Sequence, residues 1–208
     1  MDNKKIIIKD LGLKNWNEVA YSMYQFTSLR TSISSDEIWF VQHYPVFTLG
    51  KSVQQKNIYI SNTIPLFFSN RGGKITYHGP GQQLIYFLID IKRLNMNIKT
   101  FVVLLEQIII ETLNFLGIIG ISKKGFPGIY VNDRKICSLG LCIKNGCSLH
   151  GLALNVDMDL SPFDLINPCG INDLIMTQIK CFNSNVSKKK IKKILIEKCL
   201  KLFSSYYV

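Results

Sequence analysis

Residues 71–82 constrain the fold of this 208-residue chain more than any other segment, because they read Arg-Gly-Gly-Lys-Ile-Thr-Tyr-His-Gly-Pro-Gly-Gln. Glycine adopts backbone conformations that a Cβ forbids, and it lets a ligand approach the main chain closely. An apolar run that is typical of a strand follows at residues 84–89. An ordinary glycine-rich turn is the alternative, but the polar side chains between the glycines favour a pocket wall carried on a strand.

The composition fits a single globular α/β domain over residues 1–208, since 47% of the residues are hydrophobic and 19% are charged. The 25 Lys and Arg residues against 14 Asp and Glu residues give a formal net charge of +11. Such a balance suggests an acidic partner, which is a nucleic acid, an anionic membrane or an acidic protein. The alternative is a general enrichment in Lys, Ile and Asn without any such partner.

We expect a soluble, cytoplasmic protein. The apolar run in residues 1–10 is too short for a signal peptide and ends at a lysine. Polar residues, among them Glu106 and Glu111, interrupt the best membrane candidate, residues 101–121, so we predict a buried helix followed by a strand. The six cysteines form no CxxC pair and no zinc-type cluster with histidine. We therefore predict reduced thiols and no metal site.

Hydrophobic periodicity predicts helices at about residues 14–31 and at 99–116 and 187–202. It predicts strands at residues 4–9, 38–42, 64–68 and 118–121, and a strand meander over residues 128–131, 134–143 and 147–156. Asn132-Asp133 and Asn145-Gly146 are the predicted hairpin turns of that meander. Strands and helices do not alternate strictly, so we predict an α+β fold with a mixed sheet and flanking helices on one side.

The last predicted helix begins with several lysines and carries a broad apolar face. Contact with RNA or a membrane surface is one interpretation. A helix that packs on the domain with its lysines in solvent is the favoured one.

Cys169 is the cysteine whose position best suits a nucleophile. A reactive thiol must be partly exposed and close to positive charge. Pro168 and Gly170 flank Cys169 at the end of a polar loop, residues 157–167, which can present the thiol at the mouth of a cleft. Cys137 and Cys142 lie instead in a predicted strand, where cysteine usually serves as a small core residue. A structural role for Cys169 remains the alternative.

A nucleophilic cysteine usually needs a base nearby. The histidines His43, His78 and His150 are each a candidate base or a scaffold residue, and the sequence does not choose between these roles. Lys135 is the other candidate, because a lysine that is partly desolvated on a strand has a lowered pKa. The alternative is a hairpin lysine that faces solvent.

Segment 71–82 resembles the signature of the octanoyltransferases of lipoate biosynthesis. The resemblance continues, in family order and spacing, through residues 128–131, 134–136, 138–140, 146–148, 150–156, 159–163 and 166–170. This sequence departs from the family pattern at a few positions. Gln42 stands where glutamate is frequent, Tyr44 where proline is common, and Cys137 and Cys142 where cysteine is unusual. None of these departures removes a catalytic group.

The resemblance implies a fold like that of biotin and lipoate protein ligases. It implies transfer of an octanoyl group from acyl carrier protein, as its phosphopantetheine thioester, to a lysine of a lipoyl domain. The acceptors would be 2-oxoacid dehydrogenase complexes and the glycine cleavage H protein. It further implies a monomer that needs no cofactor, binds no nucleic acid and does not insert stably into a membrane.

The family's nucleophile corresponds to Cys169 and its acid/base lysine to Lys135. The resemblance places the acyl-binding residues at Arg71, Gly72, Gly73, Lys74, Ile75, Thr76, Tyr77, His78, Ser138, Leu139, Gly140, Gly151, Leu152 and Ala153. Among these, Leu139, Leu152, Ala153 and Tyr77 are expected to line an apolar slot. Burial of each methylene contributes about 0.8 kcal/mol, so the depth of the slot selects chain length only modestly.

Two rival functions remain. A ligase of the same fold would activate a free acid with ATP, and the Pro168-Cys169-Gly170 segment argues against it. A basic nucleic-acid-binding module would explain the net charge, but no recognition motif accompanies that charge.

Overall fold

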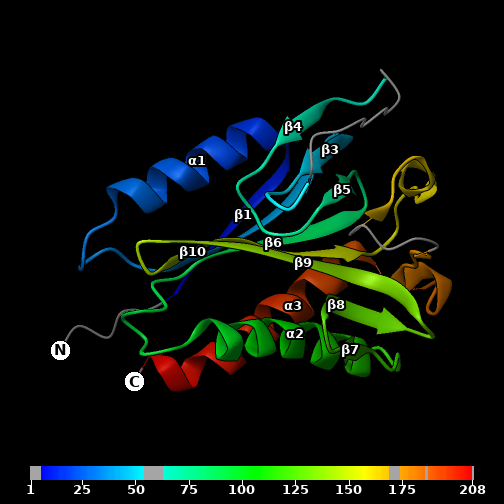
Figure 1. The fold of residues 1–208 in the computed structure, drawn as a ribbon. Coiled ribbons are helices and arrows are strands. Elements are labelled where there is room, and N and C mark those ends of the chain that lie inside the picture. Colours follow the sequence, from blue (N-terminus) through cyan, green and yellow to red (C-terminus); the bar gives the residue numbers. More distant parts are fainter. Residues whose placement is uncertain (1–5, 54–62, 169–173, 186, 208) are drawn as a thin grey trace.

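The structure, a computed structural model, describes residues 6–53, 63–168, 174–185 and 187–207 (Figure 1). In chain order its main elements are β1 (Ile7–Lys14), α1 (Trp16–Leu29), β2 (Glu37–His43), β3 (Val46–Leu49), β4 (Leu66–Phe68), β5 (Ile75–His78), β6 (Gln82–Leu88), α2 (Ile98–Phe115), β7 (Ile121–Lys123), β8 (Phe126–Val131), β9 (Arg134–Lys144), β10 (Cys147–Asn155) and α3 (Lys188–Phe203).

The strands form two sheets. The larger sheet has seven strands in the order β1-β2-β6-β10-β9-β8-β7. Its β1–β2 pair is parallel and its other pairs are antiparallel, so the predicted mixed sheet is confirmed. The smaller sheet has the order β4-β3-β5 and lies on the α1 side of the larger one (Figure 1). This second sheet is not predicted by the hydrophobic pattern of the sequence.

Helices cover both faces of the larger sheet, so the prediction that they lie on one side is wrong. Helices α2 and α3 cover the lower face in Figure 1, where Phe87 packs with Phe101 and Phe203. Helix α1 covers the opposite face, where its residue Met23 shares an apolar cluster with Tyr86. Every residue of β6 is buried. Since successive side chains of a strand point to opposite faces, a strand of this kind needs cover on both.

The boundary between the first strand and the first helix differs from the prediction. Leu13, which the sequence analysis counted as the first apolar position of the helix, lies in β1. The pairing of β1 with β2 shifts register between Asp10 and Gly12, and it continues as far as Lys14. The helix therefore begins only at Trp16, after the extended residue Asn15.

The predicted hairpins are confirmed. Asn132, Asp133, Asn145 and Gly146 all have positive φ angles, between +48° and +80°. This is the geometry that two-residue hairpin turns require. The strands on either side pair as β8 with β9 and as β9 with β10. The short strand predicted at residues 118–121 occurs later, at β7, because Gly117 and Ile118 still donate hydrogen bonds to carbonyls of α2.

Both long helices are anchored in the core. The inner face of α2 includes Phe101, Leu105 and Ile109, each of them fully buried. The buried residues of α3 are Ile191, Ile194, Leu195, Cys199 and Phe203, while the lysines at its start are exposed or half-buried. Packing of the basic helix on the domain is thus confirmed. Within the described parts of the chain, no helix is long and apolar enough to cross a membrane.

Candidate active site

A pocket lies between the larger sheet and the segment that leads into β5. The cavity volume is about 60 Å³, and the pocket is partly open to solvent. The lining residues are Trp16, Arg71, Gly72, Gly73, Lys74, Ile75, Thr76, His78, Leu84, Tyr86, Ser138, Leu139, Gly140, His150, Gly151, Leu152 and Ala153.

The floor of the pocket consists of small residues on two neighbouring strands. Gly140 of β9 pairs with Gly151 of β10, and Ser138 pairs with Ala153. A Cβ added to Gly140 would lie 3.1 Å from Arg71 Cδ, so this part of the floor directly faces the overlying segment. Short side chains at these cross-strand positions leave the sheet surface bare, and that bare surface provides the space for a ligand.

The roof, residues 71–76, is held in place by hydrogen bonds to both sheets. The Arg71 guanidinium donates to the Thr48 carbonyl at 2.7 Å and to Thr48 Oγ1 at 2.8 Å, which fixes the roof to β3. The Gly72 amide donates to the Leu141 carbonyl of β9 at 2.8 Å. The glycine-rich segment is therefore the wall of a pocket, as its composition predicted, and the ligand of that pocket stays a prediction.

The residues predicted to bind the acyl chain all line this pocket except Tyr77. The Tyr77 ring packs on Phe47 and Phe163, with ring centroids 5.5 Å and 5.6 Å away. The expectation that Tyr77 lines the slot is therefore wrong. Alternate residues of a strand point to opposite faces, so Tyr77 points away from the side that its neighbours Thr76 and His78 present to the pocket.

Sequence reasoning missed three lining residues, Trp16, Leu84 and Tyr86. Leu84 and Tyr86 pair across the sheet with Ala153 and Gly151. Their alternation along β6 is a signal that could have found them once the pairing of β6 with β10 was known. Trp16 comes from the first turn of α1, far from the other lining residues in sequence, and no motif marks it.

The three histidines are buried and hydrogen-bonded to the scaffold. His43 Nε2 lies 2.8 Å from the Tyr86 hydroxyl, His78 Nδ1 lies 2.8 Å from Gln82 Oε1, and His150 Nε2 lies 2.5 Å from Asn70 Oδ1. Burial lowers the pKa of His43 to about 4. Burial, together with the nearby Arg71 charge, lowers the pKa of His150 to about 3. The pKa of His78 is also lowered, chiefly by burial.

All three imidazoles are therefore neutral near pH 7, and their hydrogen bonds favour the scaffold role over that of a base. His78 and His150 line the pocket, whereas His43 supports it from behind Tyr86.

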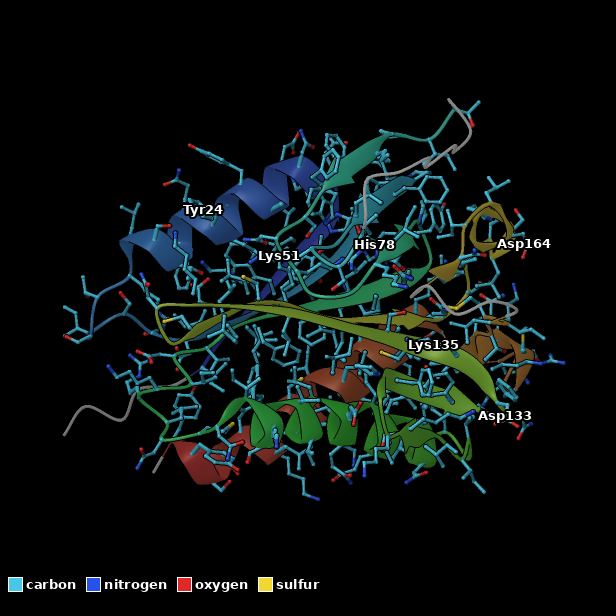
Figure 2. All side chains as sticks on the ribbon, in the orientation of Figure 1. Tyr24, Lys51, His78, Asp133, Lys135 and Asp164 are labelled. Atoms are coloured by element: carbon cyan, nitrogen blue, oxygen red, sulfur yellow. The ribbon has the colours of Figure 1, made fainter. Side chains whose placement is uncertain are left out.

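Lys135 lies near the start of β9 (Figure 2) and is only 1% exposed, so the alternative of a solvent-facing hairpin lysine is wrong. Its backbone accepts a hydrogen bond from the Thr177 amide and donates one to the Ile175 carbonyl, both at 2.9 Å. Its Nζ lies 5.5 Å from the centroid of the Tyr130 ring. A Cβ at Gly128 would come within 2.8 Å of Lys135 Cε, so the absence of a side chain there provides room for the lysine.

Cys169, the predicted nucleophile, lies outside the described residues. The residue before it, Pro168, is buried and lines a second hollow together with Ile175 and Met176. Met176 forms an isolated β-bridge with Lys135. The described chain that follows residues 169–173 therefore lies beside the strand that carries Lys135.

The five described cysteines, Cys137, Cys142, Cys147, Cys181 and Cys199, are free thiols in the structure. Burial raises the pKa of the Cys137 thiol to about 12, so this cysteine is a core residue and not a thiolate. Cys142 is half-buried, and Cys181 is exposed.

Sequence comparison relates the chain to enzymes that act in lipoylation. Residues 15–200 match the family model for the lipoyl protein ligase A/B catalytic domain. The octanoyltransferase of Buchnera aphidicola from Acyrthosiphon pisum is 51% identical over 208 residues, which is 100% of this chain and 99% of that protein. The octanoyltransferase of Escherichia coli O139:H28 is 44% identical over 205 residues, which is 99% of this chain and 96% of that protein.

Structure comparison agrees on the fold. The bipartite lipoate protein ligase of Thermoplasma acidophilum, solved in a study of an archaeal lipoylation system that includes its E2 lipoyl domain, superposes with a TM-score of 0.76. The match covers 96% of this chain and 84% of that one at 16% sequence identity. Similarity at this low identity supports the predicted ligase-like fold alone.

Proposed function

The chain belongs to the octanoyltransferases of the lipoyl protein ligase A/B catalytic-domain family, and from this premise we propose that it transfers an octanoyl group from octanoyl-acyl carrier protein to a lysine of a lipoyl domain. Membership makes the protein an acyltransferase. The observation that best supports the finer proposal is the pocket with a bare floor on β9, a strand that also carries the buried Lys135.

The acyl chain lies in the pocket, between the floor of Ser138, Gly140, Gly151 and Ala153 and the roof of residues 71–76. The buried surface is largely backbone and apolar side chain, which suits a saturated chain. Lys135 lies on the same strand as part of this apolar slot. Only Ile136 and Cys137 separate Lys135 from Ser138 along β9. The thioester carbonyl would therefore lie toward Lys135 and the hydrocarbon toward β6.

In the first step, the Cys169 thiolate attacks the carbonyl carbon of the octanoyl thioester. A bond forms between that carbon and the Cys169 sulfur, and the bond to the phosphopantetheine sulfur breaks. The departing thiolate takes a proton from the Lys135 ammonium. Before this step, the same ammonium stabilises the Cys169 thiolate and lowers its pKa from the usual value of about 8.5.

In the second step, the neutral amine of the acceptor lysine attacks the Cys169 thioester. The nitrogen forms an amide bond with the octanoyl carbonyl, and Cys169 leaves as the thiolate. Neutral Lys135 accepts the proton that the attacking nitrogen loses, which restores the starting state. Two acyl transfers through a covalent intermediate replace one slower direct transfer.

We propose lipoyl domains of 2-oxoacid dehydrogenase complexes and the glycine cleavage H protein as acceptors, and a monomeric enzyme that works without a cofactor in the cytoplasm. The net charge of +11 suits protein substrates that are acidic. Transfer from octanoyl-acyl carrier protein without ATP distinguishes this activity from that of a ligase, which would need ATP and free octanoate.

Mass spectrometry tests the covalent intermediate. After incubation with octanoyl-acyl carrier protein, the wild-type enzyme should gain one octanoyl group that neutral hydroxylamine removes. Cys169→Ser should lack this labile adduct. A hydroxylamine-labile octanoyl group on Cys169→Ser would show that another thiol is the nucleophile.

Alkylation by iodoacetamide tests the role of Lys135. At neutral pH, Cys169 in Lys135→Ala should react at least tenfold more slowly than in the wild type, because its thiolate fraction falls. Lys123→Ala is the matched control, since Lys123 Nζ also lies over the Tyr130 ring, at 4.8 Å, but pairs with the exposed Asp133. Equal alkylation rates in Lys135→Ala and the wild type would exclude the proposed pKa role.

A further inference from the structure

We propose that Trp16, the first residue of α1, closes the far end of the acyl pocket and sets the length of the acyl chain that the enzyme accepts. This inference rests on the proposed function, because it concerns the same pocket. Trp16 lies outside every segment that the family resemblance marks as acyl-binding, and it is the residue that α1 contributes to the pocket lining.

The residues of the pocket floor increase in size across three neighbouring strands. On β9 and β10 the facing residues are Ser138, Gly140, Gly151 and Ala153. The next strand, β6, places Leu84 opposite Ala153 and Tyr86 opposite Gly151. Neighbouring strands lie about 4.8 Å apart, so the floor from β9 to β6 spans about 10 Å. An extended eight-carbon chain has a similar length.

The two ends of this floor differ in chemistry. Lys135 precedes Ser138 on β9, so the reactive end lies on the β9 side. On the β6 side, α1 packs over the sheet, where its residues Val19 and Met23 share an apolar cluster with Leu84 and Tyr86. Trp16 begins this helix, lines the pocket and is only 7% exposed. The indole therefore stands where the end of an eight-carbon chain would arrive.

Packing against β4 holds the Trp16 ring in place. The ring stacks on Phe67 of β4 with centroids 5.8 Å apart and planes inclined by 25°. Tyr86, which also lines the pocket, is buried and only 3% exposed.

Two hydrogen bonds through His43 join Tyr86 to Lys14, the last residue of β1, just before α1. His43 Nδ1 lies 3.0 Å from the Lys14 carbonyl, which can only accept, so Nδ1 carries the proton. His43 Nε2 then accepts from the Tyr86 hydroxyl at 2.8 Å. Lys14 precedes Trp16 by two residues, so this chain of hydrogen bonds joins Tyr86 to the segment from which α1 begins. Trp16 is thus a fixed wall.

A fixed wall discriminates against chains that are too long more strongly than burial of methylenes alone does. A longer chain must displace the indole from its stacking on Phe67 or leave its own carbonyl short of Lys135. Close-packed interiors do not absorb an added methylene without cost. A shorter chain fits but leaves the pocket partly empty.

Acyl selectivity tests the proposal directly. Transfer of hexanoyl, octanoyl, decanoyl and dodecanoyl groups from acyl carrier protein to a lipoyl domain is measured for the wild type, Trp16→Ala and Trp16→Leu. The ratio of kcat/KM for dodecanoyl over octanoyl should rise at least tenfold in Trp16→Ala and less in Trp16→Leu, which keeps more of the wall. Tyr86→Phe, which keeps the ring but removes the hydroxyl bonded to His43, should give a smaller rise.

Trp39→Phe is the matched control. Trp39 is as buried as Trp16, at 5% exposed, and belongs to the cluster beneath α1, but it does not line the pocket. Its indole donates to Glu37 Oε2 at 2.5 Å instead. The Trp39→Phe variant should keep the wild-type order of chain lengths.

Fluorescence gives a readout that does not depend on turnover. The chain has two tryptophans, so Trp39→Phe leaves Trp16 as the only one. Titration of this variant with the unreactive thioether analogue of octanoyl-pantetheine should shift the Trp16 emission. The same titration of Trp16→Phe, in which Trp39 remains, should leave the emission unchanged.

The outcomes separate the two proposals. If the wild type transfers no acyl group from acyl carrier protein, the proposed function fails. If the wild type transfers octanoyl groups while Trp16→Ala and Trp16→Leu keep its chain-length order, the end-wall proposal is overturned. Should Trp16→Ala not fold, the Trp16→Leu ratios and the Trp16 emission decide in the same way.

Discussion

At the scale of single residues, Gly128 determines where the Lys135 side chain lies. Gly128 has a φ angle of +121°, and a Cβ there would lie 2.3 Å from the Cys137 carbonyl oxygen and 2.8 Å from Lys135 Cε. The Cys137 carbonyl belongs to the paired strand and has little freedom to move. Any side chain at position 128 must therefore push the lysine stem aside.

We expect Gly128→Ala to lower kcat/KM for octanoyl transfer at least tenfold and to destabilise the protein by about 2 kcal/mol or more, because backbone strain and a steric clash add. Gly125→Ala is the control, since Gly125 also has a positive φ, +83°, but no atom lies within 4 Å of its added Cβ. Gly125→Ala should lose only the smaller, strain-related stability in urea unfolding and keep its activity. Wild-type kinetics in Gly128→Ala would contradict the placement of Lys135.

The sequence indicated Lys135 as a candidate catalytic residue, but it did not indicate which residues surround its side chain. Its position after the Asn132-Asp133 turn was readable, because that turn is local. Its burial depends on Gly128 of the neighbouring strand and on Ile175, forty residues later in the chain, whose carbonyl accepts from the Lys135 amide. Contacts of this kind have no local signature. The prediction for Tyr77 was wrong for the same reason, since the register of β5 against β3 decides to which face the Tyr77 side chain points.

At the scale of elements, the structures that were predicted well are those with local signals. The β9–β10 hairpin follows from Asn145-Gly146, and α2 follows from its apolar period. The β4-β3-β5 sheet was missed because β3 pairs in parallel with β4 across a long connection, and β4 has only three residues. The pocket roof depends on that small sheet, so its position over β9 could not be predicted either.

Helix α2 depends on a side-chain cap at its start. Asn97 Oδ1 accepts a hydrogen bond from the Thr100 amide at 2.9 Å. Asn97→Ala should destabilise the protein by about 1 kcal/mol and lower Tm by about 3 °C, because an amide of the first turn loses its partner. Asn97→Asp keeps an acceptor at the helix start and should retain the wild-type Tm by calorimetry. Equal Tm values for Asn97→Ala and the wild type would show that the cap contributes nothing.

At the scale of the whole molecule, the net charge of +11 should favour acidic protein substrates. We expect kcat/KM with octanoyl-acyl carrier protein to fall at least severalfold as NaCl rises from about 0.05 to 0.5 M, because salt screens attraction between exposed charges. Octanoyl-pantetheine is the control donor, since it lacks the acidic protein, and its kcat/KM should change much less. Equal salt dependence of the two donors would exclude charge-guided binding of the carrier.

The three histidines should govern how the whole fold responds to mild acid. Burial lowers the pKa of His43 to about 4 and of His150 to about 3, and it lowers that of His78 as well. In the unfolded chain each histidine titrates near pH 6.5. Below that pH the unfolded state binds protons that the folded state does not, so stability is complete above about pH 6.5 and decreases as the pH falls toward the folded pKa values.

Near pH 5.5 this linkage amounts to roughly 1 kcal/mol for each histidine, so Tm should fall by about 10 °C from its value at pH 7.5. The chain has three histidines in all. Its histidines can therefore bind at most three more protons when the protein unfolds between pH 6.5 and 5. The buried Asp36 contributes only in stronger acid. Its pKa is lowered, because hydrogen bonds from Tyr207, the Asp90 amide, Arg30 and Arg93 outweigh the effect of desolvation.

His43→Gln removes one titrating group and should reduce the slope of unfolding free energy against pH by about one third. If the slope in that variant equals the wild-type slope, His43 is not the neutral, buried group that links Tyr86 to the start of α1.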